Sequence, residues 1–161
     1  MTLNDLGWNP RFEAEFADYY AKGWVPARLI RDNKISYGAV LGDRTEMEVA
    51  LGGAVYHEAE TDAELPAVGD WVVFHPTEIE GPVAIQAVLP RRSTFSRRAA
   101  GTVPYEQVIA ANIDTVFIVS GLDDNHSLRR VERYVAQGWE SGAVPVVLLN
   151  KVDVCADPES G

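Results

Sequence analysis

One stretch of the chain reads Val144-Pro145-Val146-Val147-Leu148-Leu149-Asn150-Lys151-Val152-Asp153. Its first six residues form a short, unbroken apolar run, which is typical of a β-strand that is covered on both faces in a parallel sheet. Four residues follow at once, and three of them, Asn150, Lys151 and Asp153, have polar side chains. In open α/β sheets, ligands bind just beyond the carboxyl ends of the strands. The stretch therefore predicts an α/β domain with a ligand site at Asn150–Asp153.

The chemistry of the Asn-Lys-x-Asp segment favours one purine base. An Asp carboxylate accepts two hydrogen bonds side by side, which suits the ring N–H and exocyclic amine of guanine but not the acceptor on the equivalent edge of adenine. The Asn150 amide can fasten neighbouring loops, and the alkyl stem of Lys151 can lie along the flat ring. We predict that Asn150, Lys151, Val152 and Asp153 bind the guanine of GTP. A chance match in a polar loop is the alternative.

Composition limits the classes of partner. The chain has 161 residues, 47% of them hydrophobic, and a formal net charge of −10. This acidic balance argues against indiscriminate nucleic-acid binding, so contact with RNA must come from local basic residues. The candidate phosphate-binding cations, whose alternative role is solvated surface charge, are Arg31, Lys34, Arg44, Arg91, Arg92, Arg97 and Arg98.

Cysteine usage and hydropathy point to a cytoplasmic protein that is not membrane-bound. The one cysteine, Cys155, excludes an internal disulfide and cannot anchor a metal site alone. The first residues lack the pattern of a signal peptide, and no apolar run is long enough to cross a bilayer. No metal ligands are expected in this chain.

The N-terminal part predicts a helix followed by a small barrel. Asn9, Pro10 and Gly23 supply an N-cap, a first helical residue and a C-terminal stop, so residues 1–23 are predicted as an N-terminal helical segment. Residues 24–95 carry short apolar runs separated by turn signals, which suggests a five-stranded OB-fold; a barrel of SH3 type would leave the same pattern. The predicted strands are Val25–Ile30, Ile35–Leu41, Met47–Leu51, Trp71–Phe74 and Val83–Leu89.

The C-terminal part predicts the first βαβ portion of a nucleotide-binding domain. Residues 96–112 are interpreted as a connector, and residues 113–161 hold an apolar strand at Thr115–Val119, an amphipathic helix from Leu128 to Trp139, and the strand at Val144–Leu149. The Gly-x-x-x-x-Gly-Lys-Ser/Thr loop that cradles phosphates in GTPases is absent. Either the motifs are permuted and this loop follows Gly161, or the domain is a non-catalytic relic. A single βαβ unit leaves exposed sheet edges, which favours truncation.

Several further motifs occur in one order along the chain. They are Gly7-Trp8-Asn9, Pro26-Ala27-Arg28, Pro66 to Val72, the basic connector Arg-x-Ser-x-Phe-x-Arg ending at Arg97, Gln107 to Val119, Leu128 to Tyr134, and Ser141-Gly142-Ala143 before the last strand. Together with Asn150–Asp153, they closely resemble the RsgA (YjeQ) family of ribosome small-subunit-dependent GTPases, essentially from end to end.

The resemblance implies an OB-fold, a circularly permuted P-loop GTPase domain and a C-terminal zinc-binding domain. The family hydrolyses GTP, is stimulated by the small ribosomal subunit and acts late in the maturation of that subunit. Mg²⁺ and one structural Zn²⁺ are expected in the full-length protein, with no ligands in this chain, which should be inactive alone. The partners implied are the small subunit and its rRNA, and the protein is expected to be monomeric. The alternatives are a non-catalytic RNA- or protein-binding OB module, or a conventional GTPase that lacks its first half.

Overall fold

The computed structural model describes residues 2–76, 83–98, 106–123 and 126–154. The chain divides into two compact units. The first extends to Arg92 and includes Ser96–Asn112, and the second comprises Ser93–Phe95 and the chain from Ile113 on. Within the described residues, no helix combines the length and apolarity that a membrane span requires.

The first unit begins with a short 3₁₀ helix, η1 (Leu3–Leu6), and helix α1 (Pro10–Tyr20). The Asn9 side chain caps α1 by accepting hydrogen bonds from the backbone N–H groups of Arg11 (3.0 Å) and Phe12 (3.4 Å). Pro10 occupies the first helical position, where its missing N–H costs nothing. The predicted cap and helix are confirmed.

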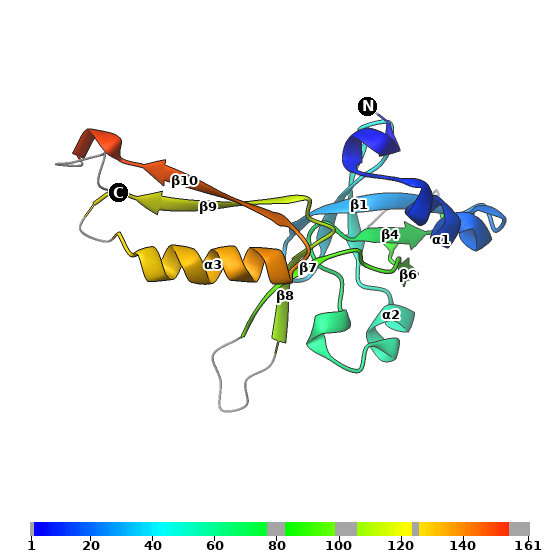
Figure 1. Cartoon of the computed structure of the whole chain (residues 1–161). Coiled ribbons are helices and arrows are strands. Elements are labelled where there is room, and N and C mark those ends of the chain that lie inside the picture. Colours follow the sequence, from blue (N-terminus) through cyan, green and yellow to red (C-terminus); the bar gives the residue numbers. More distant parts are fainter. Residues whose placement is uncertain (1, 77–82, 99–105, 124–125, 155–161) are drawn as a thin grey trace. The chain divides into compact units, whose positions relative to one another are not determined.

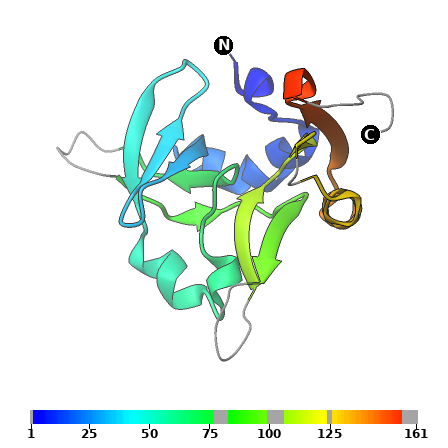
Figure 2. The same ribbon diagram turned by 90° about the vertical axis from the view of Figure 1, so that its left-hand side faces the viewer.

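A curled mixed sheet forms the body of this unit (Figures 1 and 2). Its strand order is β5-β3-β2-β1-β4-β6 among the residues that the structure describes. The pairs β1–β2, β2–β3, β1–β4 and β4–β6 are antiparallel, and β3–β5 is parallel. The strands are β1 (Val25–Asp32), β2 (Tyr37–Val40), β3 (Glu46–Ala50), β4 (Trp71–Phe74), β5 (Val83–Ala84) and β6 (Ala87–Val88).

The segment predicted as one strand, Val83–Leu89, differs from the expectation because it divides into β5 and β6. The N–H of Ile85 donates to the carbonyl of Ala50 (2.9 Å), whereas the N–H of the next residue, Gln86, donates to the carbonyl of Val73 (2.8 Å). One segment therefore occupies both outer edges of the sheet, first beside β3 and then beside β4. The sheet is a curled half-barrel with a mixed strand pattern.

Both faces of the sheet are packed, and β4 shows why its sequence does not alternate. All four of its residues are buried. Val72 and Phe74 belong to a core inside the curl that also contains Leu29, Val49 and Ile85. The neighbouring side chains of β4 join a second core, made with η1 and α1, whose buried members are Trp8, Phe12, Phe16, Trp71, Val73 and Leu89. A strand covered on both faces is expected to be apolar throughout.

Four elements were not predicted from the sequence: helix α2, the 3₁₀ turn η2 and strands β7 and β8. Helix α2 (Gly53–Glu58) follows the expected turn at Gly52-Gly53 and buries Val55 in the inner core. The segment predicted as a connector, residues 96–112, contains strand β8 (Glu106–Ala111) and most of strand β7 (Thr94–Arg98), and these strands pair as a two-stranded sheet. A 3₁₀ turn, η2 (Asp62–Glu64), precedes β4.

The second unit is the predicted βαβ arrangement. Strands β9 (Thr115–Gly121) and β10 (Val144–Asn150) are parallel, and helix α3 (Leu128–Glu140) connects them and lies along one face (Figure 1). Gly138 permits this approach, because a Cβ there would lie 3.0 Å from side-chain atoms of both Val116 and Pro145. A 3₁₀ turn, η3 (Val152–Val154), ends the described chain.

Gly69 occupies a position that only glycine fits. Its φ is +90°, and a Cβ built on it would overlap the carbonyl oxygen of Ala111. We expect Gly69→Ala to lower the free energy of unfolding of the first unit by about 3 kcal/mol. The alanine would have to adopt a left-handed backbone conformation, and its Cβ would push the backbone of Ala111 out of place. Urea unfolding followed by tryptophan fluorescence in a Trp139→Phe background checks this, because the other tryptophans lie in the first unit.

Gly53 provides the matched control. It starts α2, and a Cβ at this position meets no atom within 4 Å. Gly53→Ala should leave stability unchanged or raise it by up to about 1 kcal/mol. Equal unfolding curves for the two variants would contradict the assigned role of Gly69.

Candidate nucleotide site

The segment Asn150–Asp153 lies where two parallel strands end side by side. The register pairs Val144 with Thr115 at one end of the β10–β9 ladder and Asn150 with Gly121 at the other. One further hydrogen bond, from the N–H of Leu122 to the carbonyl of Asn150 (2.9 Å), extends the link beyond β9. The loops after the two strands are therefore fixed against each other, as expected for a ligand site in an α/β sheet.

The backbone turns sharply at the start of the tetrapeptide. Lys151 has a φ of +60°, a left-handed conformation that is uncommon for a residue with a side chain. Its N–H donates to the side-chain oxygen of Asn150 (2.8 Å). The following turn of η3 contains Asp153, whose side chain is exposed. The predicted site residues are thus contiguous at the sheet edge, with the Asp153 carboxylate accessible.

The Lys151 side chain forms an ion pair with a residue from the neighbouring strand end. Its ammonium contacts the carboxylate of Asp123, and the two side chains are 56% and 29% exposed. The pKa of Lys151 is raised mainly because its ammonium donates a hydrogen bond to the Asp123 carboxylate; the charge of Asp153 contributes less. Lys151 is therefore a charged group at neutral pH.

A pocket opens beside these loops in the second unit. It is lined by residues from β9 and its loop, by α3 and by the start of the motif. These include Ser120, Gly121, Asp123, Tyr134, Asn150 and Lys151. Ser120 also makes a hydrogen bond with the His126 ring (3.1 Å). The pocket is open and of mixed polarity, which fits one edge of a planar heterocycle with hydrogen-bonding groups.

Metal ligation is not built into the described residues. Within 2–76, 83–98, 106–123 and 126–154, no group of three or more His, Cys, Asp or Glu side chains is arranged to hold an ion.

The first candidate RNA-contacting cations lie on the hairpins of the curled sheet. Lys34 lies between β1 and β2, and Arg44 lies between β2 and β3; both are exposed and have left-handed backbones, with φ of 73° and 74°. Arg31, on β1, pairs with Glu46 at 3.0 Å, and both side chains are more than half exposed.

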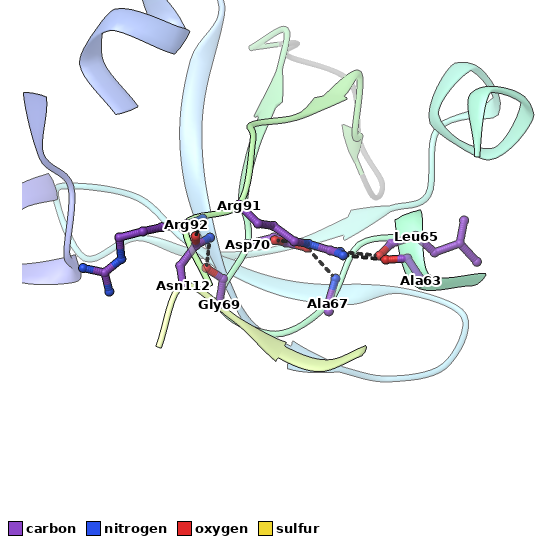
Figure 3. Close-up of polar contacts among 8 residues, drawn as sticks. All are labelled: Ala63, Leu65, Ala67, Gly69, Asp70, Arg91, Arg92 and Asn112. Atoms are coloured by element: carbon purple, nitrogen blue, oxygen red, sulfur yellow. Dashed lines mark hydrogen bonds and ion pairs between the residues drawn. The ribbon is translucent and has the colours of Figure 1, made fainter. Parts of the chain in front are cut away.

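Arg91 is internal, unlike the surface cations (Figure 3). Its guanidinium donates to both carboxylate oxygens of Asp70, at 2.9 and 2.7 Å, and to the carbonyls of Ala63 (2.5 Å) and Leu65 (2.7 Å). Asp70 also accepts from the N–H of Ala67 (2.8 Å) and is fully buried, while the Arg91 side chain is 15% exposed. This arrangement ties η2 and the start of β4 to the segment that follows β6.

The remaining candidate cations, Arg92, Arg97 and Arg98, follow β6 along the chain. The backbone N–H of Arg92 donates to the Asn112 side chain (2.8 Å), which itself donates to the carbonyl of Gly69 (3.0 Å; Figure 3). Arg97, on β7, is exposed and donates to Gln107 at 3.2 Å. The side chain of Arg98 lies outside the described part of the structure.

Sequence patterns did not single out two residues of these networks. Asp123 follows the predicted strand at Thr115–Val119, so the rule that strand ends carry ligand-binding residues could have found it. Asn112 gave no comparable signal. It is 3% exposed, with a φ of 55°, and its interactions depend on residues far away in the sequence.

Comparison with known proteins extends this description to the whole chain. A family model described as RsgA GTPase matches residues 88–160. The chain is 43% identical to the small ribosomal subunit biogenesis GTPase RsgA of Opitutus terrae, over 98% of this chain and 45% of that protein. It is 40% identical to the RsgA of Syntrophotalea carbinolica, over 99% and 45%. The chain thus spans about half the length of these curated relatives.

Solved structures agree at the level of the fold. A circularly permuted GTPase, YloQ, superposes with a TM-score of 0.59 over 85% of this chain and 44% of that one, at 15% identity. YjeQ from Thermotoga maritima gives 0.61 over 85% and 45%, at 16% identity. The curled sheet and the βαβ unit therefore share the fold of about half of a circularly permuted GTPase. Within that class, the chain belongs to the RsgA family.

Proposed function

We propose that these residues are part of a GTP-hydrolysing factor in small ribosomal subunit biogenesis, and that they carry its guanine-reading loop. The observation that carries the proposal is the match to relatives of that name over nearly the whole chain, with Asn150–Asp153 at the carboxyl end of β10. GTP is the substrate. Asp153 reads the base, Asn150 fastens the loop, and the stem of Lys151 lies along the purine.

The 161 residues do not contain the machinery for hydrolysis. Their sequence has no Gly-x-x-x-x-Gly-Lys-Ser/Thr loop, so the backbone cradle for phosphates and the hydroxyl that holds Mg²⁺ must come from elsewhere. The relatives are about twice as long, which supports a longer protein that supplies this loop, the Mg²⁺ site and a structural zinc site. We propose that the 161-residue chain alone does not turn over GTP.

For the curled sheet we propose a five-stranded OB-fold that docks on rRNA. The single segment Val83–Leu89 joins both edges of the sheet, which supports a closed barrel with β5 and β6 counted as one strand. Lys34 and Arg44 are the best-placed phosphate partners, because both are exposed on hairpin turns and neither makes an ion pair in the described structure. Arg31 and Arg91, in contrast, have carboxylate partners.

We expect the double variant Lys34→Ala/Arg44→Ala to weaken binding of the full-length protein to small ribosomal subunits roughly tenfold. The slope of log K against log salt concentration should become shallower by between about 1 and 2, because two phosphate contacts are lost. Sedimentation with purified subunits over a series of salt concentrations measures both. Lys22→Ala removes an exposed cation of the same unit, just after the C-cap of α1, and should change neither quantity. Equal losses in the two variants would contradict a specific contact.

GTP turnover by the full-length protein, with and without small ribosomal subunits, tests the main proposal. Strong stimulation by the subunits is the expected result. The protein is proposed to act as a monomer in the cytoplasm, where these subunits are assembled. If GTP is not hydrolysed in either condition, the proposal fails, and the curled sheet would instead be a non-catalytic RNA- or protein-binding module.

A further inference from the structure

We propose that Asp123 is a positioning residue for the guanine-reading loop. It holds the ammonium of Lys151 away from Asp153, so that the Asp153 carboxylate is available to the base. This inference rests on the proposed function and deepens it. Asp123 lies outside the tetrapeptide, in the loop after β9, and the structure brings it to Lys151 across the parallel strand pair.

The placement of Asp123 is fixed by the backbone. Gly121 is paired with Asn150 in the ladder, and the N–H of Leu122 still donates to the carbonyl of Asn150 (2.9 Å). The next residue is Asp123, which therefore leaves the strand edge directly beside Lys151. The left-handed φ of Lys151, +60°, likewise fixes the direction in which its side chain leaves the other strand.

The stem of Lys151 lies close to the backbone at the end of β9. A Cβ added at Gly121 would lie 3.3 Å from the Lys151 Cδ and 3.3 Å from both carboxylate oxygens of Asp123. The bare glycine thus leaves room for both side chains. A lysine stem has four rotatable bonds and loses substantial entropy when it is ordered. When Asp123 holds the Lys151 ammonium before the nucleotide binds, less conformational entropy is lost as the stem packs against a purine.

Two carboxylates act on the Lys151 ammonium, but unequally. Asp123 raises the pKa of Lys151 through a hydrogen bond and through its charge, whereas Asp153 acts only through its charge and more weakly. If Asp123 lost its charge, Asp153 would become the principal carboxylate near the ammonium. A pair formed between Lys151 and Asp153 would compete with the two hydrogen bonds that the carboxylate offers to guanine.

The test is the nucleotide preference of the full-length protein carrying Asp123→Asn. The expected result is a KM for GTP raised about fivefold with kcat changed less than twofold, since an exposed charge pair contributes at most about this much. The preference for GTP over inosine triphosphate should fall as well, because inosine lacks the exocyclic amine that Asp153 reads. Asp123→Glu keeps the charge, so its KM for GTP and its preference for GTP over inosine triphosphate should lie close to the wild-type values.

Asp114→Asn is the matched control, because Asp114 precedes β9 at the opposite end of the strand pair and is exposed. It should leave both measurements as in the wild type. Unchanged KM and unchanged discrimination in Asp123→Asn, in a protein that binds GTP normally, would overturn this inference alone. A wild-type protein without affinity for GTP would overturn the proposed function itself.

Discussion

Replacing Asp153 with asparagine is expected to weaken binding of GTP to the full-length protein about 100-fold and to create binding of xanthosine triphosphate. Hydrogen bonds to a charged group contribute about 1.5–3 kcal/mol each, and 1.4 kcal/mol is a factor of ten in affinity. The amide of the variant presents a donor where guanine also has a donor, but xanthine has a carbonyl there. Competition of both nucleotides against a fluorescent GDP analogue measures the change.

Asp153→Ala separates loss of the carboxylate from the change in specificity. It should lose affinity for GTP without gaining affinity for xanthosine triphosphate. Since Asp153 is exposed, both variants should unfold at the wild-type denaturant concentration. If Asp153→Asn kept the wild-type preference for guanine, Asp153 would not be the residue that reads the base.

Arg91→Met should be the most destabilising of the arginine substitutions, with a loss of about 3–5 kcal/mol in the free energy of unfolding of the first unit. The reason is that Asp70 would remain fully buried without its cation. Urea unfolding monitored by tryptophan fluorescence, again in the Trp139→Phe background, gives the value. A loss below about 1 kcal/mol would show that the buried pair does not hold η2 and β4 in place.

Two companion variants make this result interpretable. Asp70→Asn combined with Arg91→Met removes both charges but keeps an acceptor for the N–H of Ala67, so it should recover part of the loss. Arg31→Met breaks the exposed pair with Glu46 and should cost at most about 0.5 kcal/mol. The contrast isolates burial as the cause, because the residue type and the type of partner are the same.

Local signals in the sequence were sufficient for the elements that form by local chemistry. The cap at Asn9 and the proline at Pro10 predict α1 correctly, since these interactions involve neighbouring residues only. The apolar run into Asn150 predicts β10 for the same reason, and the guanine site at its end stays a prediction. The relatives then confirm the family that the ordered motifs indicate.

Features that depend on distant partners could not be predicted in this way. The cluster Arg91, Arg92, Arg97 and Arg98 looks uniformly cationic in sequence, but charge pattern does not report burial, and the partner of Arg91 lies at Asp70. Helix α2 starts with glycine, a poor helix former, and forms where Val55 can enter the inner core. The division of Val83–Leu89 likewise depends on which strand edges it meets.

The division of Val83–Leu89 between two sheet edges limits where the protein can gain or lose residues. The amides of Ile85 and Gln86 are consecutive, and they bond to β3 and β4 respectively, so a single peptide unit sets the spacing between the two outer edges. If a residue were inserted or deleted in this segment, the hydrogen-bond register could be kept with β3 or with β4, but not with both strands. Among related sequences, length variation should therefore concentrate in the hairpin turns and be excluded between Val83 and Leu89.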